Sequence, residues 1–186
     1  MLEKFSFGSL RLNRTGPWKL SVMANAVFPH RETLRTLLIG SLPECSMADF
    51  DLSEFTALEE LGLSYWATGC EAGTEAQLLA PHLRKFIWSF HAEEEQSESY
   101  FDFQKPQETW LRTFVHTAVH RGVPLREIHI TFDPSDYGKP GEARPSEWPW
   151  DCMERIGGEM RAVDMSLSYD KPSISRQAFY ELSAPL

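Results

Sequence analysis

The sequence is poor in positive charge and in cysteine, and each shortage excludes a class of protein. Its 18 lysines and arginines are outnumbered by 27 aspartates and glutamates, so the formal net charge is -9. A nucleic-acid binder needs clustered lysine and arginine for phosphate contacts, and because no run of this chain is basic we expect no nucleic-acid partner. The three cysteines are widely spaced without a CxxC pair, which fits neither a disulfide framework nor a zinc knuckle.

Long apolar runs and phosphate-binding glycine loops are missing as well. No segment has the roughly 18 to 20 apolar residues of a membrane span, and the N-terminus lacks the apolar run of a signal peptide. We therefore expect a cytoplasmic or nuclear protein without membrane contact. Neither GxGxxG nor GxxxxGK occurs, and we expect no cofactor.

What the sequence does contain is a phrase that recurs six times. Each copy has a leucine or methionine, two further residues, a large apolar residue, one variable residue and another large apolar residue. The copies are LEKFSF, LRTLLI, LEELGL, LRKFIW, LREIHI and MRAVDM, which start at Leu2, Leu34, Leu58, Leu83, Leu125 and Met160. Self-similarity at such intervals is typical of stacked structural units.

The end of each phrase alternates apolar, variable and apolar positions, which is the period of a strand buried on one face. This pattern predicts strands near 4–8, 36–40, 60–64, 85–89, 127–131 and 162–166. Helix signals lie between the strands, and the clearest is residues 107–122, with an apolar face and Gly122 as a C-cap. Strands alternating with helical crossovers predict an α/β fold, a parallel sheet with helices packed against it, in a single domain covering 1–186.

These phrases resemble the leucine-rich repeat, LxxLxLxxNxL, and their irregular spacing is similar to the repeat arrays of fungal F-box proteins. The resemblance covers nearly the whole chain through the Lxx[LFIV]x[LIFWM] core. It departs from the family where the repeat has asparagine or cysteine: Leu10, Leu42, Trp66, His91, Asp133 and Ser168. The resemblance implies a solenoid and protein binding. For F-box proteins it implies substrate recognition for a cullin-type ubiquitin ligase, with the F-box itself outside this chain.

The ends of the array and its long spacers predict further contacts. The first phrase follows Met1 directly, so we expect a partner, sequence beyond this chain or a second copy in a homo-oligomer to cover that edge strand. The spacers 91–106 and 133–148 are expected to be long loops, where binding often resides. Tyr100, Phe101 and Trp148 are candidate partner contacts there, with packing back onto the scaffold as the alternative.

The variable positions of the strands define a second candidate site, on the face of the sheet that lacks a core. Leu38 and Ile87 are apolar at these positions, and Gly62 between them is expected to leave a dip for a partner. Charged and polar neighbours complete the predicted partner-binding surface: Glu60, Lys85, Glu127, His129 and Asp164. An apolar centre with a charged margin is typical of protein interfaces, so we expect a protein partner of unknown identity.

Two of these residues also raise the question of catalysis. His129 and Asp164 occupy equivalent places in successive phrases, so strands in register place their side chains about 5 Å apart. With Thr131 and Ser166 as neighbours they provide a hydroxyl, a base and an acid. No nucleophile turn or oxyanion loop accompanies them, so a small hydrolase is an alternative and the expectation is that the protein is not an enzyme.

A second histidine pair has the spacing of metal ligands. His116 and His120 are four residues apart on the helix expected over 107–122. The sequence HTAVH lacks the glutamate of HExxH, and both imidazoles fall opposite the apolar stripe. Solvated histidines are the better interpretation, and we expect no metal site. The sequence thus predicts a protein-interaction module, with structural self-association as the main alternative.

Overall fold

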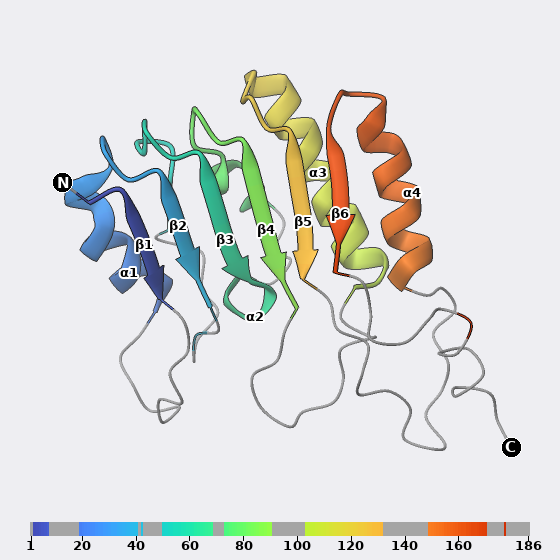
Figure 1. Cartoon of the computed structure of the whole chain (residues 1–186), viewed down its shortest axis with the longest axis horizontal. Helices are drawn as coiled ribbons and strands as arrows, with labels where there is room; N and C mark the ends of the chain where they lie inside the picture. The colour runs from blue at the N-terminus through green and yellow to red at the C-terminus, as the bar shows by residue number, and fades with distance from the viewer. Residues whose placement is uncertain are drawn as a thin grey trace, which may run out of the picture.

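Six parallel strands form one open sheet (Figure 1). The computed structural model describes residues 2–7, 19–40, 42, 50–68, 73–90, 103–131, 149–170 and 177, without the side chains of 66 and 67. Within these residues the strands are β1 (Lys4–Phe7), β2 (Thr36–Ile39), β3 (Glu60–Ser64), β4 (Lys85–Ser89), β5 (Glu127–Thr131) and β6 (Ser166–Tyr169). Each strand pairs with the next in sequence, so the order is β1-β2-β3-β4-β5-β6 and the sheet does not close on itself.

The first five strands lie where the repeated phrase predicts them, to within one residue at their ends. The fourth position of the first five phrases forms one column across the sheet, and the sixth position forms another. In the middle of the sheet these columns are Leu37, Leu61, Phe86, Ile128 and Ile39, Leu63, Trp88, Ile130. All eight side chains are buried, so the recurring phrase is the sequence signature of one continuous core.

The sixth strand lies four residues later than predicted, so the range 162–166 is wrong. Leu167 and Tyr169 stand beside Ile128 and Ile130 and continue the two columns. The MRAVDM phrase instead closes helix α4 (Pro149–Arg161), and Met160 belongs to the buried stripe of that helix. The apolar residues at the end of this helix were therefore mistaken for the alternating pattern of a strand.

Helix α4 ends in a turn that no residue of its sequence predicts. Helix α3 (Lys105–Arg121) and helix α4 both end in a Schellman motif. The backbone N–H groups of Gly122 and Val123 return to the last turn of α3 at 3.1 and 3.0 Å, and those of Asp164 and Met165 return to α4 at 3.3 and 3.1 Å. Gly122 and Asp164 both adopt left-handed backbone, with φ of 67° and 60°. Only the glycine is a recognisable stop signal, so the pattern of apolar residues does not locate the start of β6.

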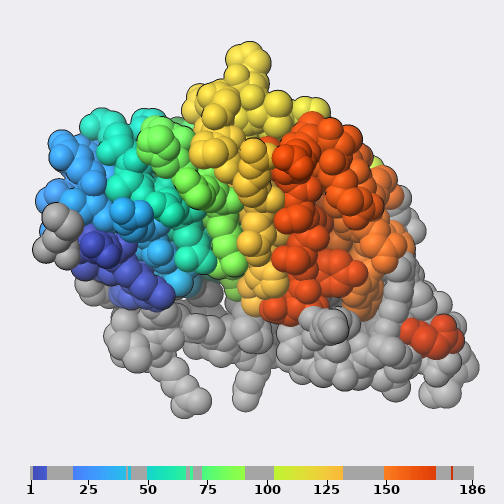
Figure 2. All heavy atoms as spheres, turned by 45° about the horizontal axis from the view of Figure 1, so that its top comes forward, coloured from blue at the N-terminus to red at the C-terminus, as the bar shows by residue number. Residues whose placement is uncertain are grey.

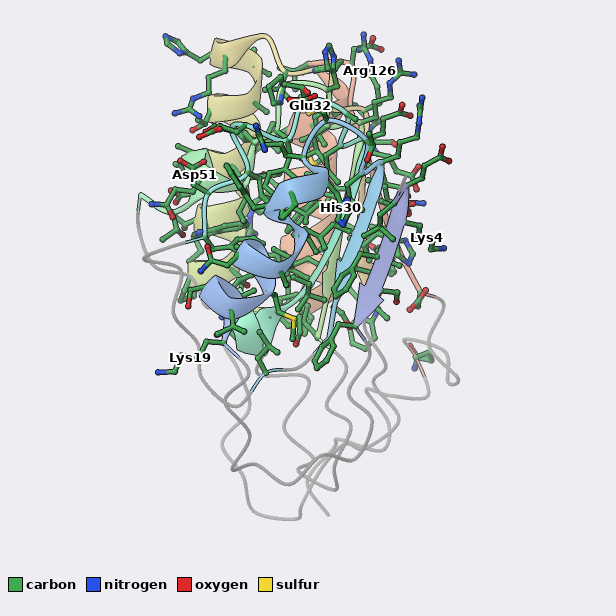
Figure 3. All side chains as sticks on the ribbon, turned by 90° about the vertical axis from the view of Figure 1, so that its left-hand side faces the viewer. Lys4, Lys19, His30, Glu32, Asp51 and Arg126 are labelled. Carbon is green, nitrogen blue, oxygen red and sulfur yellow. The ribbon has the colours of Figure 1, made fainter. Side chains whose placement is uncertain are left out.

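The helices cover one face of the sheet and leave the other face open. Besides α3 and α4 they are α1 (Leu20–Val27), α2 (Tyr65–Thr68) and the 3-10 turns η1 (Phe28–His30) and η2 (Glu75–Leu78). Figure 3 shows the sheet from its edge, with Lys19 and Asp51 on the helix side and Lys4 on the opposite side. In Figure 2 the strands form adjacent bands of colour, and no other coloured element lies across them.

The predicted loop 91–106 ends earlier than expected, because α3 already begins at Lys105. Gln104 and Gln107 form a capping box there, in which the backbone N–H of Gln104 donates to Oε1 of Gln107 at 2.9 Å. Phe103 is fully buried and belongs to the core. Residues 91–102 and all of the predicted loop 133–148 lie outside the described residues, and with them Tyr100, Phe101 and Trp148.

Aromatic rings fill the core behind β4. The rings of Trp88 and Trp110 have centroids 4.7 Å apart, and Trp110 stacks on Phe114 at 5.4 Å. The Trp88 indole donates from Nε1 to Oγ1 of Thr68 at 3.2 Å, which satisfies its buried N–H. Such close packing holds β4 in place, and with it the side chains that β4 presents on the open face.

Candidate functional site

The open face of the sheet carries two rows of side chains that cross all six strands, and a third row, Ser64, Ser89 and Thr131, on β3 to β5 alone. The row nearest the start of the strands carries charge and hydroxyl groups: Lys4, Thr36, Glu60, Lys85, Glu127 and Ser166. Nζ of Lys85 lies 3.2 Å from Oε1 of Glu127 on the next strand. The second row holds Ser6, Leu38, Gly62, Ile87, His129 and Ser168. The predicted binding residues of strands β2 to β5 therefore do share one surface.

Three consecutive residues of the second row form an apolar seam, namely Leu38, Gly62 and Ile87. The expected dip at Gly62 is wrong. A Cβ atom added to Gly62 would lie 2.6 Å from Cδ2 of Leu38 and 3.6 Å from Cβ of Ile87. The Leu38 side chain therefore leans over the glycine and fills the space, and the three residues make a continuous apolar surface rather than a socket.

The pairing of His129 with Asp164 is also wrong. In the register of the sheet the neighbour of His129 is Ser168, and Asp164 lies in the turn before β6. The Asp164 carboxylate instead accepts a hydrogen bond from Nη1 of Arg126 at 2.7 Å. The error follows from the displaced sixth strand, since a shift of four residues exchanges which side chains face each other.

His129 nevertheless has a carboxylate and a hydroxyl as partners. Its Nδ1 lies 2.9 Å from Oγ of Ser168, and its Nε2 lies 3.0 Å from Oδ1 of Asp170. The chain of hydroxyl, imidazole and carboxylate can pass a proton from serine to histidine. The Asp170 side chain is 47% exposed, so the three groups form a solvated polar end to the second row. Sequence reasoning missed Asp170 because it misplaced the strand before it.

Another cluster, on the helix side, was not foreseen from the sequence. The Glu108 side chain on α3 is completely buried, and its carboxylate accepts hydrogen bonds from Nε and Nη2 of Arg155 at 2.8 and 2.5 Å. Arg112 donates to it at 2.7 Å and also forms two bonds to Glu159, at 2.6 and 2.8 Å. The hydrogen bonds from Arg155 are the main reason that the pKa of Glu108 falls to about 2, with burial opposing the change. The cluster fastens α3 to α4.

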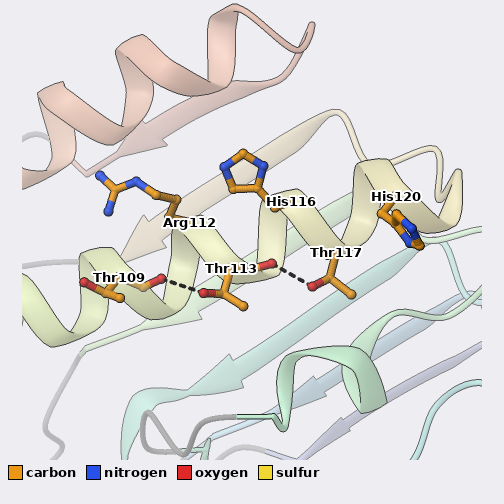
Figure 4. A pocket seen from close by; sticks show the side chains of 6 residues that line it. All are labelled: Thr109, Arg112, Thr113, His116, Thr117 and His120. Atoms are coloured by element: carbon orange, nitrogen blue, oxygen red, sulfur yellow. Dashed lines mark hydrogen bonds between the residues drawn. The ribbon is translucent and has the colours of Figure 1, made fainter.

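The outer surface of α3 carries a shallow hollow of about 450 Å³, shown in Figure 4. It is lined by Thr109, Arg112, Thr113, His116, Thr117 and His120. The threonine hydroxyls turn inward and donate to backbone carbonyls four residues earlier, at 2.8 to 3.1 Å, so they present methyl groups to solvent. His116 and His120 are exposed. Among the described residues no cluster of three or more potential metal ligands is present.

Comparison with family models, with curated proteins and with solved structures found no match. No helix of the described segments is both long and apolar enough to cross a membrane. The candidate site therefore depends on the geometry of this chain alone.

Proposed function

We propose that the chain is a leucine-rich-repeat-like solenoid that acts as a protein-interaction module through the open face of its sheet. Three features support the solenoid. The strands follow one another in sequence order, the helices lie on one side, and the first five copies of the phrase stack in register. The resemblance to F-box proteins adds the proposal of substrate recognition for a cullin-type ubiquitin ligase in the cytoplasm or nucleus.

The observation that carries the binding role is the apolar seam in the middle of the open face. Leu38 and Ile87 are only half-buried, and in Figure 2 no other coloured element lies across the strands of the sheet. The neighbouring row carries charged groups beside the seam, on strands β3, β4 and β5: Glu60, Lys85 and Glu127. An apolar centre within a polar rim is the arrangement of protein interfaces.

Affinity capture with seam variants tests this function. Leu38→Glu and Ile87→Glu place a charge in the seam, and we expect each to lower partner recovery about tenfold or more, because burying an unpaired carboxylate in an interface is costly. Val119→Glu is the matched control, since Val119 is 47% exposed on the outer surface of α3. Equal recovery by wild type and both seam variants would show that the open face is not the binding site.

A hydrolase is the second candidate, and the hydrogen bonds of His129 are the observation in its favour. In this mechanism Ser168 attacks an ester carbonyl, His129 takes the serine proton, and Asp170 orients the imidazole. Hydrolysis of a p-nitrophenyl ester that both Ser168→Ala and His129→Ala abolish would support it. Activity that is equal in wild type and variants would eliminate it.

A further inference from the structure

The edge of the sheet at which the strands begin divides into two halves of different charge. This edge is uppermost in Figure 1. In the half before β1, β2 and β3, acidic groups outnumber basic ones, and the arginines are paired. Nη1 of Arg35 lies 2.5 Å from Oε1 of Glu59, and Nε of Arg31 lies 3.8 Å from Oε2 of Glu54.

The other half carries four arginines, which we name the basic edge: Arg84, Arg121, Arg126 and Arg161. Arg84 and Arg126 are neighbours, because the backbone N–H of Arg126 donates to the carbonyl of Arg84 at 2.9 Å. Arg121 ends α3 and Arg161 ends α4. Asp164 is the one carboxylate that the described residues place in the turns of this half, and its partner is Arg126. In these turns and helix ends arginines therefore outnumber carboxylates, in a chain whose net charge is -9.

Two of these arginines have no partner within the part of the chain that the structure describes. The side chains of Arg84 and Arg161 are exposed and make no hydrogen bond or ion pair with a described residue. Guanidinium groups are well suited to bidentate recognition of carboxylates. Arg84 is also close to the apolar seam, because it lies three residues before Ile87, or about 10 Å along an extended chain.

We infer that the partner of the open face is a protein segment that sets an acidic side chain on the basic edge, at Arg84, and a large apolar side chain on the seam. This inference rests on the proposed function. Since neighbouring residues of an extended segment point to opposite sides, the separation of about 10 Å corresponds to two or four residues in an extended segment, or to about seven in a helix. Asp170 at the other end of the strands disfavours the reverse orientation, since it would face the acidic group.

Selection from a library of random peptides on the immobilised chain tests the inference. We expect the bound peptides to be enriched in aspartate or glutamate at one of these spacings from a large apolar residue. Arg84→Glu should weaken the selected peptides about tenfold, which corresponds to the loss of one favourable charge contact and the gain of a repulsive one. Lys19→Glu is the control, because it makes the same charge change at an exposed cation on the helix side (Figure 3).

The outcomes separate this inference from the proposed function. Peptides that depend on Ile87 but carry no acidic enrichment and tolerate Arg84→Glu would overturn the acidic partner and leave the binding face intact. Peptides that bind independently of both Ile87 and Arg84 would overturn both. A short DNA duplex that binds as tightly as the selected peptides, and loses that binding in Arg84→Glu, would show that the basic edge recognises phosphate instead.

Discussion

The two faces of the sheet obey different constraints, and strand β4 shows the difference in adjacent residues. Trp88 points to the helix side, where it is completely buried among aromatic rings. Ile87 points to the open side and is half-buried. The helix side is determined by the need to form a core, whereas apolar residues on the open side contribute less to folding. The proposed binding role depends on two such residues of the open side, Leu38 and Ile87.

Truncating each of these neighbours should produce the largest contrast between the faces. Trp88→Ala removes a fully buried ring and should lower the free energy of unfolding by about 3 to 5 kcal/mol. Ile87→Ala should lower it by about 1 kcal/mol or less, because its side chain is already in partial contact with water. Urea denaturation followed by fluorescence measures both values. Similar losses would mean that the open face is part of the core.

The buried carboxylate on the helix side should give the next largest effect. Glu108→Gln removes the buried carboxylate to which Arg155 and Arg112 both donate, and we expect a loss of about 3 kcal/mol in unfolding free energy. The control is Glu154→Gln on the exposed surface of α4, which should change stability by no more than about 0.5 kcal/mol. Chemical denaturation of both variants measures the difference, and equal stabilities would contradict the role of Glu108 in fastening the helices.

The same carboxylate predicts a dependence of stability on pH. Folding lowers the pKa of Glu108 from 4.5 to about 2, so its contribution is complete above pH 4.5 and is lost as the pH falls toward 2. The pKa of Glu159 is lowered in the same direction by its hydrogen bonds from Arg112. Stability of the wild-type protein should therefore fall across this window, and Glu108→Gln should show a shallower decline. Parallel profiles would contradict the assignment.

The ends of α3 and α4 should give smaller and unequal effects. Gly122→Ala forces a side chain into left-handed backbone and should cost about 1 to 2 kcal/mol. Asp164→Gly relieves that strain but removes the exposed ion pair with Arg126, so we expect a change within about 1 kcal/mol. Thermal unfolding of both variants tests whether the two turns are equivalent. A large loss in Asp164→Gly would assign Asp164 a role beyond the turn.

The sequence predicted the part of the fold that depends on periodicity. Burial on one side of a strand imposes a period of two, so alternation alone was enough to assign Leu61, Phe86 and Ile128 to one column. The sixth strand could not be placed, because Asp164 takes the backbone role that glycine takes at Gly122. Because an aspartate stands where a glycine would mark the end of the helix, the strand was predicted four residues too early. The predicted partner of His129 was therefore wrong as well.

The candidate site was predictable in outline but not in its contacts. Leu38, Ile87 and the charged row follow from alternation, whereas the inward lean of Leu38 over Gly62 depends on a side-chain conformation. The burial of Glu108 was equally hidden, since a helical Glu and Arg four residues apart usually form an exposed pair. The separation of charge along the sheet edge could not be predicted, because the prediction needs the positions of the turns before β5 and β6.

Methyl NMR with labelled leucine and isoleucine tests the central claim most directly. On adding a peptide selected against the wild-type chain, the methyl signals of Leu38 and Ile87 should shift, while those of Leu61 and Ile130 on the covered face should stay in place. Shifts confined to the helix side, or none at Leu38 and Ile87 with binding intact, would contradict the account of the open face as the binding surface.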